Sequence, residues 1–230
     1  MKKLLDVGCG PGTISNIGIY SNLKNQFNIY GIDLLRNNIS LIRTRFPKGN
    51  FRVGKAEKLP FKKGYFNVVL ARHVLEHVND PDKSLEEIRR VSKMGGKLTL
   101  AVPHVFFEQI TSKITPHYIE KGHHHQRIFN KKTLVSALRK HGYKIESISN
   151  DKWPFFVINM VLSTLARFSS LKMEEQTGIF LVGKKNYIRD RRFYNQYLLI
   201  YKLLEILNNT FFFLNYLIPF ELNVTARKVK

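Results

Sequence analysis

The glycine-rich segment at residues 4–13, Leu-Leu-Asp-Val-Gly-Cys-Gly-Pro-Gly-Thr, constrains the fold more than any other part of the chain. An apolar run leads into Asp6, and glycines follow at positions 8, 10 and 12 before a helical pattern begins. Glycines at such a turn let the backbone approach a ligand that side chains would exclude. The segment therefore predicts a strand, a tight turn and a helix that together hold a nucleotide-type cofactor.

The spacing of these glycines separates two classes of cofactor. Dinucleotide-binding turns carry G-x-G-x-x-G or A, with the pyrophosphate on the helix N-terminus, whereas this chain has G-x-G-x-G with Thr13 in the sixth place. Asp6 also stands just before the turn. A carboxylate there would repel a pyrophosphate but can hold the ammonium group of a methionine moiety. Both features favour S-adenosylmethionine (SAM) over NAD.

A second acid, Asp33, ends the apolar run Ile-Tyr-Gly-Ile-Asp. An acid about 20 residues beyond a cofactor turn, at the end of the next strand, can accept hydrogen bonds from both ribose hydroxyls. The alternative is that Asp33 only caps the following helix. The spacing favours ribose binding.

Short apolar runs alternate with helical patterns along residues 3–102, which is typical of an α/β fold with a parallel sheet. The pattern predicts strands at 3–7, 28–33, 51–54, 66–71 and 97–102, and helices at 13–24, 36–46 and 82–93. The third helix is expected to begin after Asn79-Asp80-Pro81 and to close with Gly95-Gly96.

The second half of the chain is less regular. Residues 103–130 show little periodicity and many histidines and aromatics, which indicates a substrate loop. A helix is expected at 131–141, stopped by Gly142, and a strand at 143–149. Two segments, 178–185 and 221–228, are alternatives for the final strand.

We therefore expect two parts: a SAM-binding core at residues 1–150 and a C-terminal elaboration at 151–230. The elaboration would consist of apolar helices and the final strand, and would cover the site. Its apolar stretch at 153–168 is shorter than the roughly 20 residues needed to span a bilayer.

The motifs, in their order, resemble class I SAM-dependent methyltransferases, particularly the small-molecule branch that includes the quinone-biosynthesis enzymes. The resemblance covers residues 3–149 and implies a Rossmann-like, doubly wound, mainly parallel seven-stranded sheet with helices on both faces and a C-terminal helical and aromatic elaboration. It rests on Leu-Asp-Val-Gly-Cys-Gly-Pro-Gly, Tyr-Gly-Ile-Asp, Ala-Glu-Lys-Leu-Pro-Phe at 56–61, Phe-Asn-Val-Val at 66–69, His-Val-Leu-Glu-His-Val at 73–78, Asp80-Pro81 and Gly-Gly-Lys-Leu at 95–98.

The resemblance also implies which residues bind the cofactor. The methionine end of SAM would be lined by Asp6, Gly8, Cys9, Gly10 and Gly12; the ribose would be held by Asp33 and Leu34; adenine would be bordered by Ala56 and Glu57; and the floor beside the sulfonium would be closed by Arg72 and His73. Lys55 stands where the family usually has an acid that accepts a proton from the adenine amino group. A lysine cannot accept one, so adenine contact there is expected from the backbone.

A second departure lies at the beginning of the sequence. Most family members carry a helical segment before the first strand, whereas this sequence begins on the strand. The alternatives are a truncated start or a C-terminal segment that supplies the missing cover.

Methyl transfer from SAM mainly needs a well-oriented nucleophile and exclusion of water, so a catalytic base is not obligatory. Where an oxygen nucleophile needs a base, histidine is the usual supplier near neutral pH. The candidates are His73 and His125, and the alternative is that they are exposed or simply hydrogen-bonded. His77 is expected to be packed. The histidines lack matching carboxylate or cysteine spacing, so no metal site is predicted.

The charge of the chain bears on its partners. There are 38 Lys and Arg against 17 Asp and Glu, which gives a formal net charge of +21. This charge favours an anionic partner such as nucleic acid, a membrane surface or a phosphorylated substrate, although solvated surface lysines are an alternative. The single cysteine favours a reducing compartment, and we expect a cytoplasmic protein or one at the membrane periphery.

The sequence thus predicts a SAM-dependent methyltransferase acting on a small-molecule or lipid-like acceptor. An aromatic and basic C-terminal third could present an interfacial surface to such an acceptor, or could instead complete a core. One alternative is an RNA methyltransferase, although no Asn/Asp-Pro-Pro-Tyr/Phe tetrapeptide follows the fourth strand. The other is a non-catalytic SAM-fold protein that binds a membrane or partner through its C-terminus.

Overall fold

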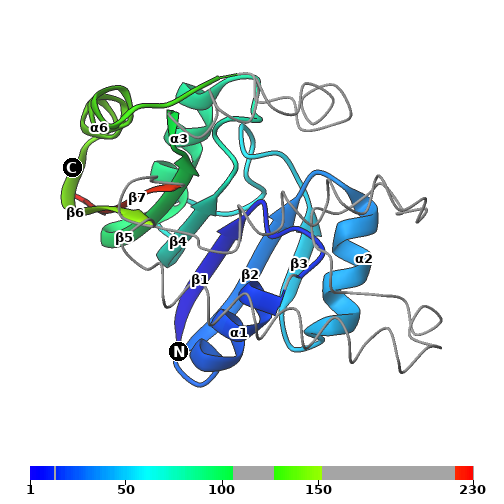
Figure 1. Ribbon diagram of the computed structural model, residues 1–230. Coiled ribbons are helices and arrows are strands. Elements are labelled where there is room, and N and C mark those ends of the chain that lie inside the picture. Colours follow the sequence, from blue (N-terminus) through cyan, green and yellow to red (C-terminus); the bar gives the residue numbers. More distant parts are fainter. Residues whose placement is uncertain (13, 106–126, 152–220, 230) are drawn as a thin grey trace, which may run out of the picture. The chain divides into compact units, whose positions relative to one another are not determined.

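The computed structural model describes residues 1–12, 14–105, 127–151 and 221–229. This part of the chain forms one seven-stranded sheet in the order β3-β2-β1-β4-β5-β7-β6, with helices packed against it (Figure 1). The strands are β1 (Lys2–Val7), β2 (Phe27–Asp33), β3 (Asn50–Val53), β4 (Phe66–Arg72), β5 (Ser92–Pro103), β6 (Tyr143–Asp151) and β7 (Glu221–Lys228). The helices are α1 (Ile14–Leu23), α2 (Arg36–Arg45), α3 (Pro81–Val91) and α6 (Lys131–Lys140).

The order of the strands locates the crevice of the sheet. From β1 the chain builds outward through β2 and β3, and it then returns to add β4 and β5 on the other side of β1. These five strands are parallel, whereas β7 runs antiparallel to its neighbours β5 and β6. The order in which strands are added to the sheet thus reverses between β1 and β4. Ligands of doubly wound sheets bind at the carboxyl ends of the strands at such a reversal. The expected α/β class and mainly parallel seven-stranded sheet are confirmed.

Each face of the sheet has its own core. Successive strand residues point to opposite faces, so the neighbours Leu4 and Leu5 of β1 enter different clusters. Leu4 packs with residues of α1 and α2, namely Tyr20, Ile39 and Ile42. Leu5 belongs to the cluster that holds the inward residues of α3 and α6, namely Leu85, Ile88, Leu134 and Leu138. Helices therefore cover both faces, as predicted.

Capping residues explain where α3 and α6 begin. The Asp80 side chain accepts a hydrogen bond from the Lys83 amide at 2.9 Å, and Pro81 occupies the first helical position, where its missing N–H is harmless. Asn130 forms a capping box with Thr133. Gly142, with φ of +71°, follows the end of α6. The expected starts of both helices, and the stop at Gly142, are confirmed.

The end of α3 differs from the prediction. The helix expected at 82–93 is present, but its expected end with Gly95-Gly96 as the stop is wrong, because α3 ends at Val91 and β5 begins at Ser92. Phe66 pairs with Ser92 but Val68 pairs with Lys97, so the intervening residues of β5 form a bulge. Glycines inside a strand often mark such a bulge. Gly95 and Gly96 therefore belong to the bulge of β5 and do not end α3.

The final strand of the sheet is β7, which matches the expected segment 221–228; the alternative at 178–185 lies outside the described residues. Residues Met1–Asp151 and Pro219–Lys230 form one compact unit, and Lys152–Ile218 form a second. The final strand, which the expected division grouped with residues 151–230, thus completes the core sheet. A covering role for the remainder stays a prediction. No helix among the described residues is long and apolar enough to cross a membrane.

Candidate functional site

The turn between β1 and α1 is shaped for backbone contact with a ligand. Gly8 and Gly10 have φ of +71° and +60°, in the left-handed region that favours glycine. A Cβ atom at Gly8 would lie 2.5 Å from Cγ2 of Val74, so packing requires glycine there. A Cβ at Gly10 would meet no heavy atom within 4 Å. Gly10 therefore borders open space that a ligand can enter, which fits the SAM cradle expected at this turn.

Asp33, at the end of β2, is joined to this turn. The Gly10 amide donates to Asp33 Oδ2 at 2.9 Å, and Asp33 Oδ1 accepts 2.9 Å bonds from the Leu35 amide and from Asn38 Nδ2. Three of about four accepting positions on the carboxylate are thus used. Two ribose hydroxyls could both bind only if one of these donors moved away. The N-cap of α2 is Leu35 and the helix has no side-chain cap, so Asp33 does not cap α2; its bonds to the Leu35 amide and to Asn38 hold the segment that leads into the helix.

Asp6 is buried beneath the turn, with 2% of its surface exposed. The Tyr20 hydroxyl, from α1, donates to Asp6 Oδ2 at 2.5 Å. Burial raises the pKa of Asp6 to about 6, while the bond from Tyr20 and the charge of Arg72 lower it and the charge of Asp33 raises it. Tyr20 is not among the site residues expected from the sequence. The available signal is a tyrosine among the apolar residues of an expected helix, since a buried phenol needs a partner.

Cys9 and Leu34, which are expected beside the methionine and ribose groups, differ in their exposure. The Cys9 side chain is fully buried among the residues that pack against α1 and α2, and burial raises the pKa of its thiol. Only the backbone of Cys9 belongs to the turn, where its amide donates to the Ile32 carbonyl at 2.9 Å. Leu34 is 60% exposed beside Asp33. An apolar surface is therefore available next to the proposed ribose contact.

The segment expected to border adenine follows β3, which pairs with β2 and ends opposite Asp33. The Gly54 amide donates to the Asp33 carbonyl at 3.0 Å, so this segment stays beside the end of β2. Ala56 is buried, and Glu57 Oε1 accepts a hydrogen bond from the Asn79 amide at 3.1 Å. Lys55 is exposed. The expected adenine residues thus lie at the same edge of the sheet as Asp33.

At the end of β4, His73 lies between two carboxylates. Its Nδ1 is 3.3 Å from Glu76 Oε1 and its Nε2 is 3.5 Å from Glu221 Oε1. Although desolvation lowers the pKa of His73, hydrogen bonds and charge interactions with Glu221 and Glu76 outweigh it and raise the pKa to about 9. An imidazolium cannot accept a proton, so this charge state argues against His73 as a base at neutral pH. Its φ of 54° is unusual for a non-glycine residue and is typical of functional sites.

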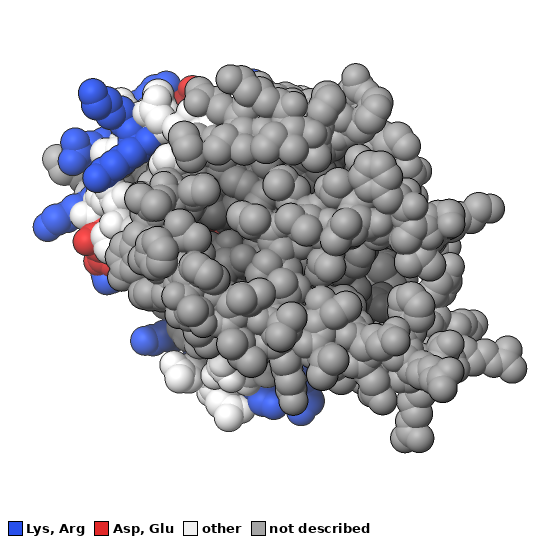
Figure 2. Space-filling model, viewed as in Figure 1, with Lys and Arg blue, Asp and Glu red and all other residues white. Residues whose placement is uncertain are grey.

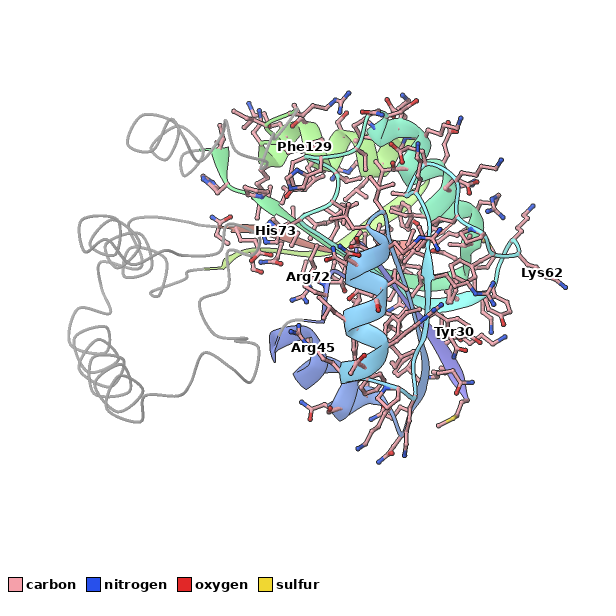
Figure 3. The ribbon with its side chains drawn as sticks, turned by 90° about the vertical axis from the view of Figure 1, so that its right-hand side faces the viewer. Tyr30, Arg45, Lys62, Arg72, His73 and Phe129 are labelled. Atoms are coloured by element: carbon pink, nitrogen blue, oxygen red, sulfur yellow. The ribbon has the colours of Figure 1, made fainter. Side chains whose placement is uncertain are left out.

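Figure 3 shows Arg72 and His73 next to each other at the end of β4. Glu221 reaches His73 from β7, near the end of the sequence. Glu221 could not be expected at the site from the sequence, because nothing in the local pattern shows that β7 inserts next to β5.

Two other histidines are named in the sequence-based expectations, His125 and His77. His125 lies outside the described residues. The expectation that His77 is packed is wrong: it is exposed, because residues 74–77 form a turn rather than a helix that could bury it. Within the described ranges, no three His, Cys, Asp or Glu side chains are grouped so that they could hold a metal ion.

Comparison with known proteins agrees with this geometry. Residues 1–148 match the family model described as a methyltransferase domain. The chain is 34% identical over 100 residues to the demethylmenaquinone methyltransferase of Renibacterium salmoninarum, covering 44% of this chain and 40% of that protein. It is 29% identical over 158 residues to a ubiquinone biosynthesis O-methyltransferase of Xanthomonas euvesicatoria, covering 64% of each. The matches thus span less than two thirds of either relative.

A solved structure shows the same fold. Phosphoethanolamine N-methyltransferase 2 of Haemonchus contortus, in complex with S-adenosyl-L-methionine, superposes with a TM-score of 0.60 at 19% identity, covering all of this chain and 49% of that one. The family match extends over well more than half of the present chain and contains the turn, Asp33 and the end of β4. The chain therefore belongs to the methyltransferase domain family, has the fold of class I SAM-dependent methyltransferases and is similar in sequence to relatives named for quinone biosynthesis.

Proposed function

We propose that this chain transfers a methyl group from SAM to a small-molecule acceptor, with the cofactor held at the carboxyl ends of β1, β2 and β4. The observation that carries the proposal is the open space at Gly10, on a turn tied directly to Asp33. In this proposal, Asp6 lies on the side of the cofactor's ammonium group and Asp33 on the side of its ribose.

SAM, when bound, would supply a methyl group on a positively charged sulfur, which leaves as a neutral thioether once the acceptor has taken the methyl group. The residues of this chain would then orient the reactants and keep water out. Glu76 and Glu221 carry two negative charges around the single positive charge of His73, so this cluster favours a nearby cation. His73 would hold its proton rather than take one, and we propose that its role is to fix Glu76 and Glu221 beside the site.

The acceptor that we propose is an apolar, quinone-like or lipid-like small molecule. Support comes from the two relatives named for the menaquinone and ubiquinone pathways. Both His125 and the apolar stretch at 153–168, the further candidates on the acceptor side, lie outside the described residues.

A methyl-transfer assay tests this proposal. Purified protein is given SAM with a labelled methyl group and a panel of demethylated quinols, with catechols and small amines as further acceptors. Label in a quinol product supports the full proposal, and label only in another small molecule retains the activity but corrects the acceptor. Absence of transfer to every acceptor, together with SAM binding, would favour the non-catalytic alternative.

Two glycine variants make the assay specific to the turn. Gly10→Ala and Gly64→Ala both place a Cβ at a positive φ, of +60° and +64°, in space with no heavy atom within 4 Å. The two substitutions therefore cause similar backbone strain, but only Gly10 lies in the turn that is proposed to bind SAM. We expect Gly10→Ala to lose methyl transfer and Gly64→Ala to retain it; equal activities would contradict the assignment of the site.

We also propose contact with an anionic membrane surface. Figure 2 shows lysine and arginine side chains gathered on the part of the surface where Figure 1 places α6. The exposed basic residues of this helix are Lys131, Lys132, Arg139 and Lys140. Basic residues near an anionic leaflet each contribute about 1 kcal/mol of attraction.

Flotation with vesicles tests the membrane proposal. Binding to vesicles with anionic lipid, and loss of that binding in a Lys131→Glu, Lys132→Glu variant, is expected. Binding only to RNA, weakened steeply by salt, would instead favour the nucleic-acid alternative.

A further inference from the structure

A guanidinium group contacts the cofactor turn from outside. Arg45 is the last residue of α2, and its Nη1 donates to the carbonyl oxygens of Pro11 and Gly12 at 2.8 and 3.0 Å. Figure 3 shows Arg45 on the side of α2 that faces α1, where the turn enters that helix. These two carbonyls belong to the turn that begins at Gly8. One nitrogen of Arg45 thus ties α2 to the second half of the turn.

The turn needs such support because of its conformation. Gly8, Gly10 and Gly12 all have positive φ, and glycines lose more conformational freedom on folding than any other residue. The first half of the turn is fixed by the bonds of the Cys9 and Gly10 amides to residues at the end of β2. Arg45 supplies charge-assisted bonds to the second half, and such bonds are stronger than those between neutral groups.

We propose that Arg45 is a positioning residue for SAM: it holds the glycine turn in the shape that binds the cofactor, without contacting the cofactor itself. This inference rests on the proposed function, because it assumes that the turn is the cofactor cradle. If the turn has its binding shape in only a fraction of the molecules, the apparent Kd for SAM equals the intrinsic Kd divided by that fraction. Loss of Arg45 would therefore weaken SAM binding more than it weakens the fold.

The chain offers a matched control two residues away. Arg43, on the same helix, donates through Nε and Nη2 to the Phe51 carbonyl at 3.1 and 2.6 Å. Arg43→Ala removes the same charge and the same kind of bonds, but at β3 rather than at the turn. A general effect of charge or of helix anchoring would affect the two variants alike.

The test measures SAM affinity by calorimetry for the wild type, Arg45→Ala, Arg45→Lys and Arg43→Ala. We expect Arg45→Ala to raise the Kd about tenfold, equivalent to about 1.4 kcal/mol, Arg45→Lys to recover part of the loss, and Arg43→Ala to bind as the wild type. At saturating SAM, kcat of Arg45→Ala should approach that of the wild type, because the defect lies in binding.

Amide hydrogen exchange without ligand separates positioning from direct contact. Faster exchange at residues 8–12 in Arg45→Ala, but not in Arg43→Ala, is expected. Weaker SAM binding with unchanged exchange would mean that Arg45 contacts SAM directly. Equal Kd values in all variants would mean that Arg45 has no role in SAM binding. Either result overturns the inference while leaving the proposed function intact. A wild type that does not bind SAM would overturn both.

Discussion

The hydroxyl of Tyr20 donates to Asp6 Oδ2 at 2.5 Å, in a site where both side chains are almost completely buried. The bond joins α1 to the end of β1, directly beneath the turn that separates them. Asp6 is thus both the acid that precedes the glycines and a buried charge that the fold must accommodate. Its environment leads to two predictions that need no ligand.

Replacement of Tyr20 by Phe should destabilise the protein by about 1–3 kcal/mol, the usual effect of leaving a buried polar group without its partner. Equilibrium unfolding in urea at pH 7.5 measures this change. Tyr30→Phe is the control: its hydroxyl lies 3.3 Å from that of Tyr65 in a partly exposed pair, and its loss should change stability by less than about 0.5 kcal/mol. Equal effects of the two substitutions would contradict the importance of the Tyr20–Asp6 bond.

Asp6→Asn should alter how stability depends on pH. The pKa of Asp6 is raised from 3.8 to about 6 in the folded protein, so the folded state binds the proton more tightly than the unfolded state. The stabilisation that results is fully present below pH 3.8 and is lost as the pH rises through 6. The charged carboxylate therefore costs about 3 kcal/mol at pH 7.

Unfolding of the wild type and of Asp6→Asn at several pH values measures that cost. The stability of the variant relative to the wild type should increase from pH 4 to pH 7. A difference that does not change over this range would show that Asp6 titrates normally.

Glu221→Gln should lower the pKa of His73, because it removes one of the two carboxylates beside the imidazole. In the wild type the pKa is raised from 6.5 to about 9, so the ring's contribution to stability is fully present below pH 6.5 and is lost as the pH rises through 9. NMR titration of the His73 ring measures the shift. Glu146→Gln, which removes the partner of Arg227 elsewhere on the sheet, should leave it unchanged. A wild-type ring that titrates near 6.5 would restore His73 as a candidate base.

Gly8→Ala should be more destabilising than Gly10→Ala. Both substitutions place a side chain in the left-handed region, at a cost of about 1–2 kcal/mol. At Gly8 the new Cβ would also lie 2.5 Å from Val74 Cγ2, whereas the space at Gly10 is open. Thermal unfolding of the two variants tests this order, and equal melting temperatures would show that the backbone moves to relieve the contact.

The glycine turn, Asp33 and the parallel strands could be predicted from the sequence because each depends on local spacing. The turn needs glycine where φ is positive, and Asp33 follows it at a fixed distance along the chain. The partners of these residues could not be predicted in the same way. Tyr20, Arg45 and Glu221 come from α1, α2 and β7, and their contacts depend on how those elements pack.

The errors of prediction have a related cause. Gly95-Gly96 suggested the end of a helix, because local sequence does not distinguish a glycine stop from a glycine bulge; only the pairing of Phe66 with Ser92 shows which is present. His77 was expected to be packed because His73 and His77 share a face if the segment is helical. The chain instead bends at His73, which has a left-handed conformation, and residues 74–77 form a turn.

Calorimetry of SAM binding tests the central claim most directly. The wild type and Gly64→Ala should each bind SAM at one site and show no heat with NAD, whereas Gly10→Ala should bind SAM at least tenfold more weakly. Absence of SAM binding by the wild type, or binding of NAD in its place, would contradict the assignment of the turn at residues 8–12 as the SAM site.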